Sequence, residues 1–235
     1  MFGVYSEKNQ QAVKKSKCLP GLVYYLYWFF ALCYLESAVH FTVYGGFHTR
    51  FLYTIGLTAA IAALISLIFS WFSRKVRFAA TLVTTMALTF LYGSQMVYEF
   101  IFGTMYSVAQ MGLGGAALAS FWRETLMTMW EKLPYIASLL IPLAALVLLR
   151  KFVPGMFQGS FGKQRIFLVL AAVVFHVAVL FCLRTGGTGM FTDYYYYYSD
   201  TIATNQTAER FGILTMLRLE LIGSFGGEVE EEVYF

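Results

Sequence analysis

Two ionisable side chains lie inside one long apolar stretch near the start of the chain. Glu36 and His40 are four residues apart, about one helical turn, so both side chains lie on the same face of a helix. A carboxylate and an imidazole placed this way can relay a proton or hold a metal ion. Both residues fall in the last third of the stretch, where they can meet water, headgroups or the loop that contains Arg50. We therefore interpret Glu36 and His40 as an intramembrane polar pair with a structural or interfacial role.

Two further ionisable residues lie in or beside apolar segments. Glu99 follows a third apolar segment, and a salt bridge to Arg123 or Lys132 would place it at the membrane surface. His176 stands alone in the middle of the last apolar segment, which favours a neutral histidine that hydrogen-bonds a neighbouring helix.

Sequence signatures of catalysis are missing from the chain. It has no Gly-rich phosphate loop, nucleophile elbow, HExxH motif or paired-carboxylate motif. Cys18, Cys33 and Cys182 form no CxxC spacing, which excludes the usual zinc and disulfide patterns. We expect no catalytic residue, metal site or cofactor in this chain, and no nucleic-acid partner.

The composition indicates a membrane protein. Of 235 residues, 59% are hydrophobic and 13% charged, whereas soluble domains are about 45 to 50% apolar and about a quarter charged. A single core cannot bury 23 Phe, 17 Tyr and 4 Trp behind so few charges, so much apolar surface must face lipid.

Five windows have the length and composition of membrane-spanning helices, giving an all-α polytopic fold. A span needs about 20 residues. Pro142 should kink the fourth window and leave one carbonyl needing another partner. The windows are residues 22–43, 51–72, 78–98, 133–149 and 166–183.

Basic residues predict the orientation. Eleven lie in residues 1–20, 73–77 and 150–165, and six lie in the alternate connections and the C-terminal segment. The positive-inside rule places the basic tail, residues 1–20, in the cytoplasm and the C-terminus outside. A cleaved signal peptide is the competing interpretation, but no small-residue cleavage site follows the first apolar stretch promptly.

The connection after the third window predicts an amphipathic helix over residues 116–131. Its apolar side chains recur at helical spacing, and Trp122 and Trp130 suit the headgroup level of the outer leaflet. Trp122, Arg123, Trp130 and Glu99 are thus candidate lipid or interface contacts. The alternative is a helix packed on the spans without a lipid role.

The composition changes after residue 184, and we interpret residues 185–235 as an extracytoplasmic linker outside a membrane domain over residues 21–184. Five consecutive tyrosines, residues 194–198, suit an interfacial belt or a low-complexity linker. Residues 208–221 have helical periodicity, and Asn205 begins a short glycosylation pattern.

Three stretches resemble the membrane region of the lipoteichoic acid synthase family. They are LTFLYGSQMVYEFIFGTMYS (88–107), GGAALASFWRETLMTMW (114–130) and NQTAERFGILTMLRLEL (205–221). Members of that family are phosphoglycerol transferases of the sulfatase and alkaline phosphatase superfamily, anchored by five helices in the bacterial cell membrane.

The resemblance implies an anchoring role. In that family a large extracytoplasmic domain carries the threonine nucleophile and a metal, usually manganese, and uses phosphatidylglycerol as donor. No residue of this chain matches that machinery, so the resemblance implies a membrane half whose partners are its own missing catalytic domain and membrane lipids, including phosphatidylglycerol.

Two other functions are compatible with the sequence. The first is a self-sufficient small membrane protein that binds lipid or a partner, and DNA encoding a sulfatase-like domain downstream of Phe235 would decide against it. The second is a transporter, but the spans offer few facing polar groups and no inverted repeat.

Overall fold

The computed structural model describes residues 19–47, 51–107, 120–157, 161–186, 194–199 and 204–225, and all regular structure in these ranges is helical. Several features predicted above lie outside the described residues. These are the basic tail up to residue 18, Arg50, residues 116–119 of the amphipathic segment and the C-terminal residues 226–235.

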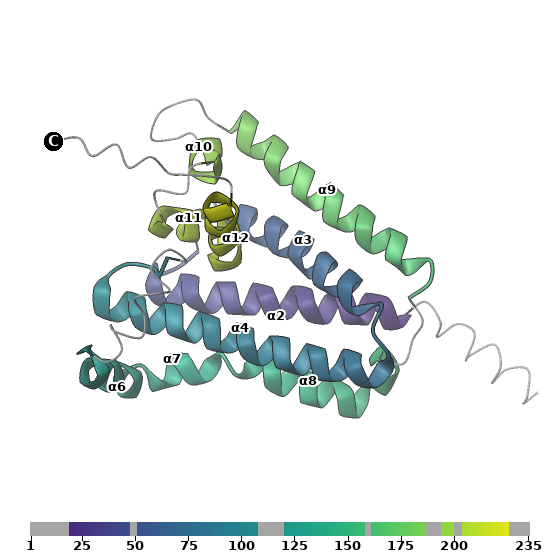
Figure 1. The fold of residues 1–235 in the computed structure, drawn as a ribbon, viewed down its shortest axis with the longest axis horizontal. Coiled ribbons are helices and arrows are strands. Elements are labelled where there is room, and N and C mark those ends of the chain that lie inside the picture. The colour runs from purple at the N-terminus through teal and green to yellow at the C-terminus, as the bar shows by residue number, and fades with distance from the viewer. Residues whose placement is uncertain are drawn as a thin grey trace, which may run out of the picture.

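Five helices in the described ranges are long and apolar enough to cross a membrane, as the sequence predicts. They run back and forth beside one another (Figure 1). The fourth consists of two shorter helices. The helices are α2 (Leu19–Val43), α3 (Phe51–Phe69), α4 (Arg74–Phe102), α7 (Leu133–Ser138) with α8 (Ile141–Phe152), and α9 (Gln164–Thr185).

The α4 helix is longer at both ends than the apolar window that predicted it. It includes a basic first turn after Ser73, because charged side chains can extend to the membrane surface while the backbone stays helical. It ends at Gly103, whose φ of 67° is readily adopted by glycine and whose N–H donates to the Glu99 carbonyl.

Proline interrupts the fourth span as its position predicts. Pro142 lacks an N–H, so the carbonyl four residues earlier, on Ser138, has no intrahelical donor. The Tyr34 hydroxyl of α2 donates to that carbonyl at 3.1 Å. A neighbouring span therefore supplies the missing hydrogen bond, as a lipid environment requires.

Small residues bring α3 and α9 close together. A Cβ added at Gly56 would lie 2.5 Å from Cγ2 of Val179, so a larger residue there would force the helices apart. This packing resembles other helix pairs in membranes, where small side chains allow close backbone approach. Only 28% of the α9 span is buried, so most of α9 faces lipid.

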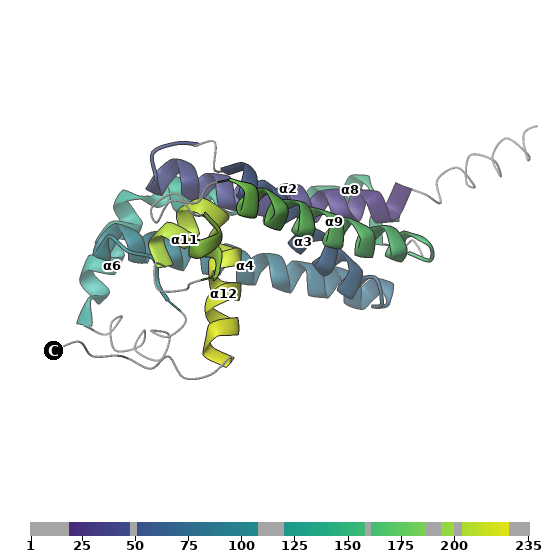
Figure 2. The same cartoon turned by 90° about the horizontal axis from the view of Figure 1, so that it is seen from above.

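Three helices follow the last span and gather at one end of the bundle (Figure 1). They are α10 (Tyr194–Ser199), α11 (Thr204–Phe211) and α12 (Ile213–Phe225). The sequence predicted one helix over residues 208–221, but Gly212 has a φ of 86° and breaks it in two. The α12 helix consequently runs crosswise to the spans (Figure 2).

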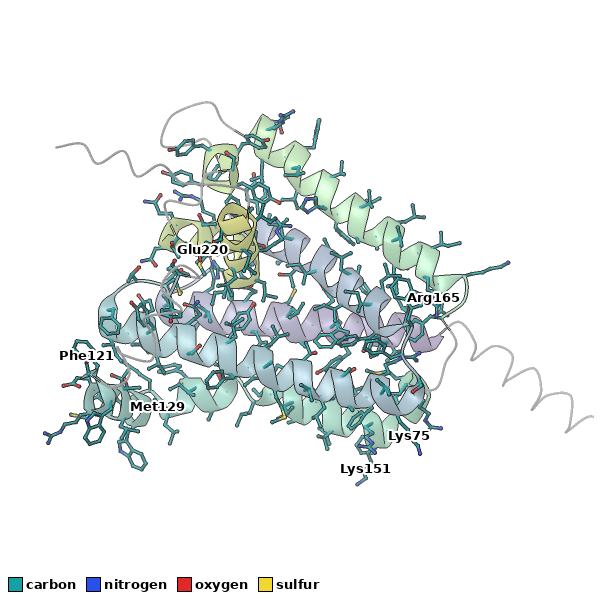
Figure 3. All side chains as sticks on the ribbon, viewed as in Figure 1. Lys75, Phe121, Met129, Lys151, Arg165 and Glu220 are labelled. Atoms are coloured by element: carbon teal, nitrogen blue, oxygen red, sulfur yellow. The ribbon has the colours of Figure 1, made fainter. Side chains whose placement is uncertain are left out.

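Labelled side chains identify the two ends of the bundle. Lys75, Lys151 and Arg165 gather at the end where α2 begins, beside the short helix η3 (Pro154–Phe157) (Figure 3). Glu220 and Phe121 lie at the opposite end. We call the first the basic end and the second the α12 end.

Candidate functional site

The polar side chain of Glu36 binds the start of α12. Its carboxylate accepts hydrogen bonds from the Tyr92 hydroxyl at 2.6 Å, the Ile213 N–H at 3.0 Å and the Leu214 N–H at 3.3 Å. The first N–H groups of a helix have no partner within the helix, and the helix dipole favours a negative charge beside them. Glu36 is 2% exposed, so its three donors replace the water that it loses.

His40 binds α11, the helix that precedes Gly212. Its Nε2 lies 2.7 Å from the backbone carbonyl of Glu209, near the end of α11, where carbonyl groups lack helical partners. Its ring also contacts Phe51, with centroids 4.6 Å apart. Glu36 and His40 therefore hold the two sides of one corner, formed by α11, Gly212 and α12. We call this the docked corner.

The docked corner has room for glycine alone at its apex. A Cβ added to Gly212 would lie 2.6 Å from the nearer Glu36 oxygen. The positive φ of Gly212 is also unfavourable for other residues. The close approach of carboxylate and backbone therefore depends on this glycine.

Apolar packing adds to the polar contacts. Ala208, Ile213 and Met216 are buried against Leu35 of α2 and Tyr92 of α4 in one cluster. Fully burying an Ile or Met side chain contributes about 1.5 to 3 kcal/mol. The segment after the last span thus packs as part of the bundle, although the sequence suggested a linker.

A second attachment joins α11 to the loop after α4. The Asn205 side-chain oxygen accepts from the Met105 N–H and the Thr104 hydroxyl, and its amide donates to the Gly103 carbonyl at 3.2 Å. The amide nitrogen that a glycan would modify is therefore engaged in a hydrogen bond at the protein surface. Tyr44 donates to the Asn205 carbonyl at 3.5 Å, and burial raises the pKa of Tyr44, which keeps it a neutral donor.

The basic end is held by arginine. Arg77 is 5% exposed and donates to backbone carbonyls of Phe69 and Phe72, at 3.1 and 3.0 Å, where α3 ends. It also donates to the Phe157 carbonyl of η3 at 3.1 Å. Arg165 of α9 joins the same group through the Ser70 carbonyl at 3.0 Å. In the sequence both arginines indicate only the topology, because nothing in their spacing points to backbone partners.

The candidate interface residues lie mainly on α6 (Trp122–Glu131), none of whose residues is buried. Trp122 and Trp130 are 59% and 78% exposed, and Arg123 is exposed as well. Two aromatic contacts beside α6 attach it to α4. The Phe121 ring packs against the Phe102 ring, and the Lys132 ammonium lies over the Phe100 ring. Glu99 is half-buried, and no ion pair joins it to Arg123 or Lys132 in the described part of the chain.

The remaining ionisable residues form no metal site in the described ranges, where no group of three His, Cys, Asp or Glu side chains comes together. His176 is half-buried on α9 beside Tyr198, with ring centroids 6.5 Å apart. Glu36 and His40 each contact the docked corner, so the hydrogen bonds of this pair support a structural role.

The fold and this site define a polytopic α-helical membrane protein with five spanning helices, onto which a C-terminal helical segment docks. Comparison with protein-family models finds no match, and neither does a search of curated proteins or of solved structures.

Proposed function

We propose that this chain is the membrane domain of a lipoteichoic acid synthase-like phosphoglycerol transferase in a bacterial cell membrane. Its role is to anchor and orient an extracytoplasmic catalytic domain at the outer leaflet. The proposal combines the three resembling stretches with one structural observation: the segment after the last span is docked by Glu36 and His40.

The docking matters because it restricts orientation. A catalytic domain joined through a flexible linker would sample many orientations, whereas a helix fixed to the bundle holds its attachment point in place. For an enzyme whose lipid donor lies in the membrane, a fixed height and direction over the headgroups favours productive encounters. Two of the resembling stretches, residues 88–107 and 205–221, contact each other through Asn205 and the loop after α4.

The transporter alternative gains no support from Gln95 and Thr85, two polar residues of the spans. Gln95 exchanges hydrogen bonds with the Tyr106 backbone at 2.8 and 2.7 Å, and Thr85 bonds to the Tyr27 hydroxyl at 2.8 Å. These groups join helix to helix or helix to loop. They are therefore occupied by the protein itself.

A fusion experiment tests the anchoring proposal. The chain would be joined to the catalytic domain of a sulfatase-like phosphoglycerol transferase and reconstituted in phosphatidylglycerol vesicles with manganese, with release of diacylglycerol measured. We expect a higher rate than for the same catalytic domain on an unrelated single-span anchor, and a lower rate for the Glu36→Ala fusion. Equal rates for all three fusions would reject the orienting role. The chain alone, which has no described metal cluster, should release no diacylglycerol.

The proposed orientation has its own test. Single cysteines would replace Ser73 at the basic end and Ser199 at the α12 end, both exposed, in a cysteine-free protein. An impermeant thiol reagent applied to intact cells should label only the Ser199 variant. Labelling of the Ser73 variant alone would reverse the orientation.

A further inference from the structure

The tyrosine run of α10 is packed against arginines from three different helices. Arg210 of α11 lies over the Tyr197 ring, with 3.9 Å from its guanidinium carbon to the ring centroid. Arg184 of α9 lies over Tyr195 at 5.0 Å. Arg218 of α12 lies over Tyr198 at 5.4 Å and donates to its hydroxyl. We call these three arginines with the α10 tyrosines the arginine–tyrosine layer.

The layer carries positive charge that described acidic side chains do not neutralise. Arg210 is 8% exposed, and the Nε groups of Arg210 and Arg218 are buried without a hydrogen-bond partner. Among the described residues, no carboxylate lies within ion-pair distance of the three arginines. Ring faces attract cations but provide no acceptor for an N–H group that lies off the ring.

Two acidic residues in the described part of α11 and α12 make contacts outside the layer. Glu220 accepts a hydrogen bond from the Thr204 hydroxyl at 2.9 Å. Glu209 lies close enough to Tyr44 to contribute to the raised pKa of that phenol. The side-chain acceptor of Arg210 is the neutral amide of Gln206, at 3.1 Å. Two guanidinium groups with spare N–H donors are a typical arrangement for binding phosphate.

An apolar groove adjoins the layer. It has a volume of about 420 Å³ and runs between α3 and α9, on the part of the bundle that faces lipid. Tyr194 links the two features, because it lines the groove and its ring centroid lies 6.0 Å from Arg210. The groove is lined by Leu52, Tyr53, Phe175, Ala178, Val179, Cys182 and Tyr194.

The position of these features points to a lipid. The layer lies just beyond Thr185, where the last span ends, which is the headgroup level at which tyrosine is enriched. A phosphate there and an acyl chain in the groove would belong to one molecule. We propose that the arginine–tyrosine layer binds the phosphate of an anionic phospholipid whose acyl chain lies in the groove between α3 and α9.

Lipid binding to the purified protein tests this site. Native mass spectrometry in micelles would compare phosphatidylglycerol with phosphatidylcholine, and competition with inorganic phosphate would separate a headgroup site from a lipid site. We expect phosphatidylglycerol to bind more tightly than phosphatidylcholine. The Arg210→Gln, Arg218→Gln double variant should lose at least about tenfold in phosphatidylglycerol affinity, since each charged hydrogen bond contributes about that much.

Control variants separate the site from general charge and from folding. Arg150→Gln with Lys151→Gln removes the same charge at the basic end and should leave binding unchanged. Ala178→Trp fills the groove from its exposed side and should weaken phosphatidylglycerol binding without changing the thermal unfolding temperature. This variant also tests the proposal if the double arginine variant does not fold.

Three results would overturn the proposal. Equal affinity for phosphatidylcholine would remove the anionic preference. Unchanged phosphatidylglycerol binding by a folded double variant would show that Arg210 and Arg218 do not bind the lipid. The third result is competition by inorganic phosphate with an affinity equal to that of phosphatidylglycerol, while the Ala178→Trp variant binds phosphatidylglycerol normally. That combination would show that the site binds a free anion and not a lipid.

Discussion

The basic end and the α12 end both contain buried arginines beside helix ends, but the partners of these arginines differ. Arg77 donates to carbonyls of Phe69, Ser70, Phe72 and Phe157 at 3.0 to 3.3 Å. Arg210 instead stacks on a tyrosine ring and leaves its Nε without a partner. A cation surrounded by backbone carbonyls is structural, whereas a cation with spare donors can bind an anion.

The comparison also shows how the helix dipole is used. At the basic end, arginines cap the C-terminus of α3, where the dipole is negative. At the α12 end, the Glu36 carboxylate caps the N-terminus of α12, where the dipole is positive. The end of α3 and the start of α12 therefore each receive a side chain of the opposite charge from another helix. The caps differ in what they hold: Arg77 holds the spans together, and Glu36 holds the segment that follows them.

The largest expected effect follows from removing the cap at the basic end. Arg77→Ala would leave several buried carbonyls without donors and should lower the free energy of unfolding by about 3 to 5 kcal/mol. Unfolding in micelles by sodium dodecyl sulfate, followed by circular dichroism, would measure it. Arg74→Ala, one turn earlier and exposed, is the control and should change stability by less than about 0.5 kcal/mol. Similar losses for the two variants would contradict a structural role for Arg77.

The cap at the α12 end should affect a smaller part of the molecule. Glu36→Ala removes the acceptor for Tyr92 and for two backbone N–H groups, which should weaken docking of α11 and α12 by about 3 kcal/mol. Hydrogen exchange in residues 204–225 should become faster, while exchange in α3 and α9 stays the same. Faster exchange across all spans would mean that Glu36 stabilises the whole bundle.

The spans were predictable because lipid imposes a simple rule. A helix that crosses a bilayer needs about 20 apolar residues, and α3 or α9 meets this requirement without reference to any other part of the chain. The effect of Pro142 was predictable for the same reason, since the missing N–H is a local property. The exact donor, Tyr34, was not, because the pairing depends on how two helices pack.

The docked corner was only half predictable. The spacing of Glu36 and His40 indicated a shared face, but their partners lie 169 to 178 residues away in the chain. Gly212 lay inside a periodic pattern that predicted a continuous helix, and its left-handed conformation leaves no trace in that pattern. A glycine between two short helical segments, with a buried carboxylate elsewhere in need of donors, is the signal that links them.

The apex of the docked corner gives a smaller and more local effect. Gly212→Ala combines a strained φ with a Cβ 2.6 Å from Glu36, and should cost about 1 to 3 kcal/mol of docking. Gly45→Ala is the matched control, because Gly45 has a φ of 73° but open space around an added Cβ. A greater loss for Gly212→Ala, measured by hydrogen exchange in residues 204–225, would show the contribution of close packing. Equal losses would reduce the role of Gly212 to backbone conformation.

The smallest effect comes from removing one hydroxyl at each end. Tyr24 and Tyr92 are both fully buried, so Tyr→Phe substitution leaves the ring packing intact. The Tyr24 hydroxyl bonds to Thr81, which also donates to the Arg77 carbonyl, so Tyr24→Phe leaves Thr81 with a partner and should cost about 1 kcal/mol. The Tyr92 hydroxyl donates to a carboxylate, and a hydrogen bond to a charged group contributes about 1.5 to 3 kcal/mol, so Tyr92→Phe should cost more. The same detergent titration would compare the two variants, with the Glu36→Gln background as a test of coupling. Two results together would contradict this. Tyr92→Phe would lower the free energy of unfolding no more than Tyr24→Phe does, and its effect would be the same in the Glu36→Gln background. The Glu36 carboxylate would then not depend on Tyr92, and the hydroxyl contacts at the two ends would be equally weak.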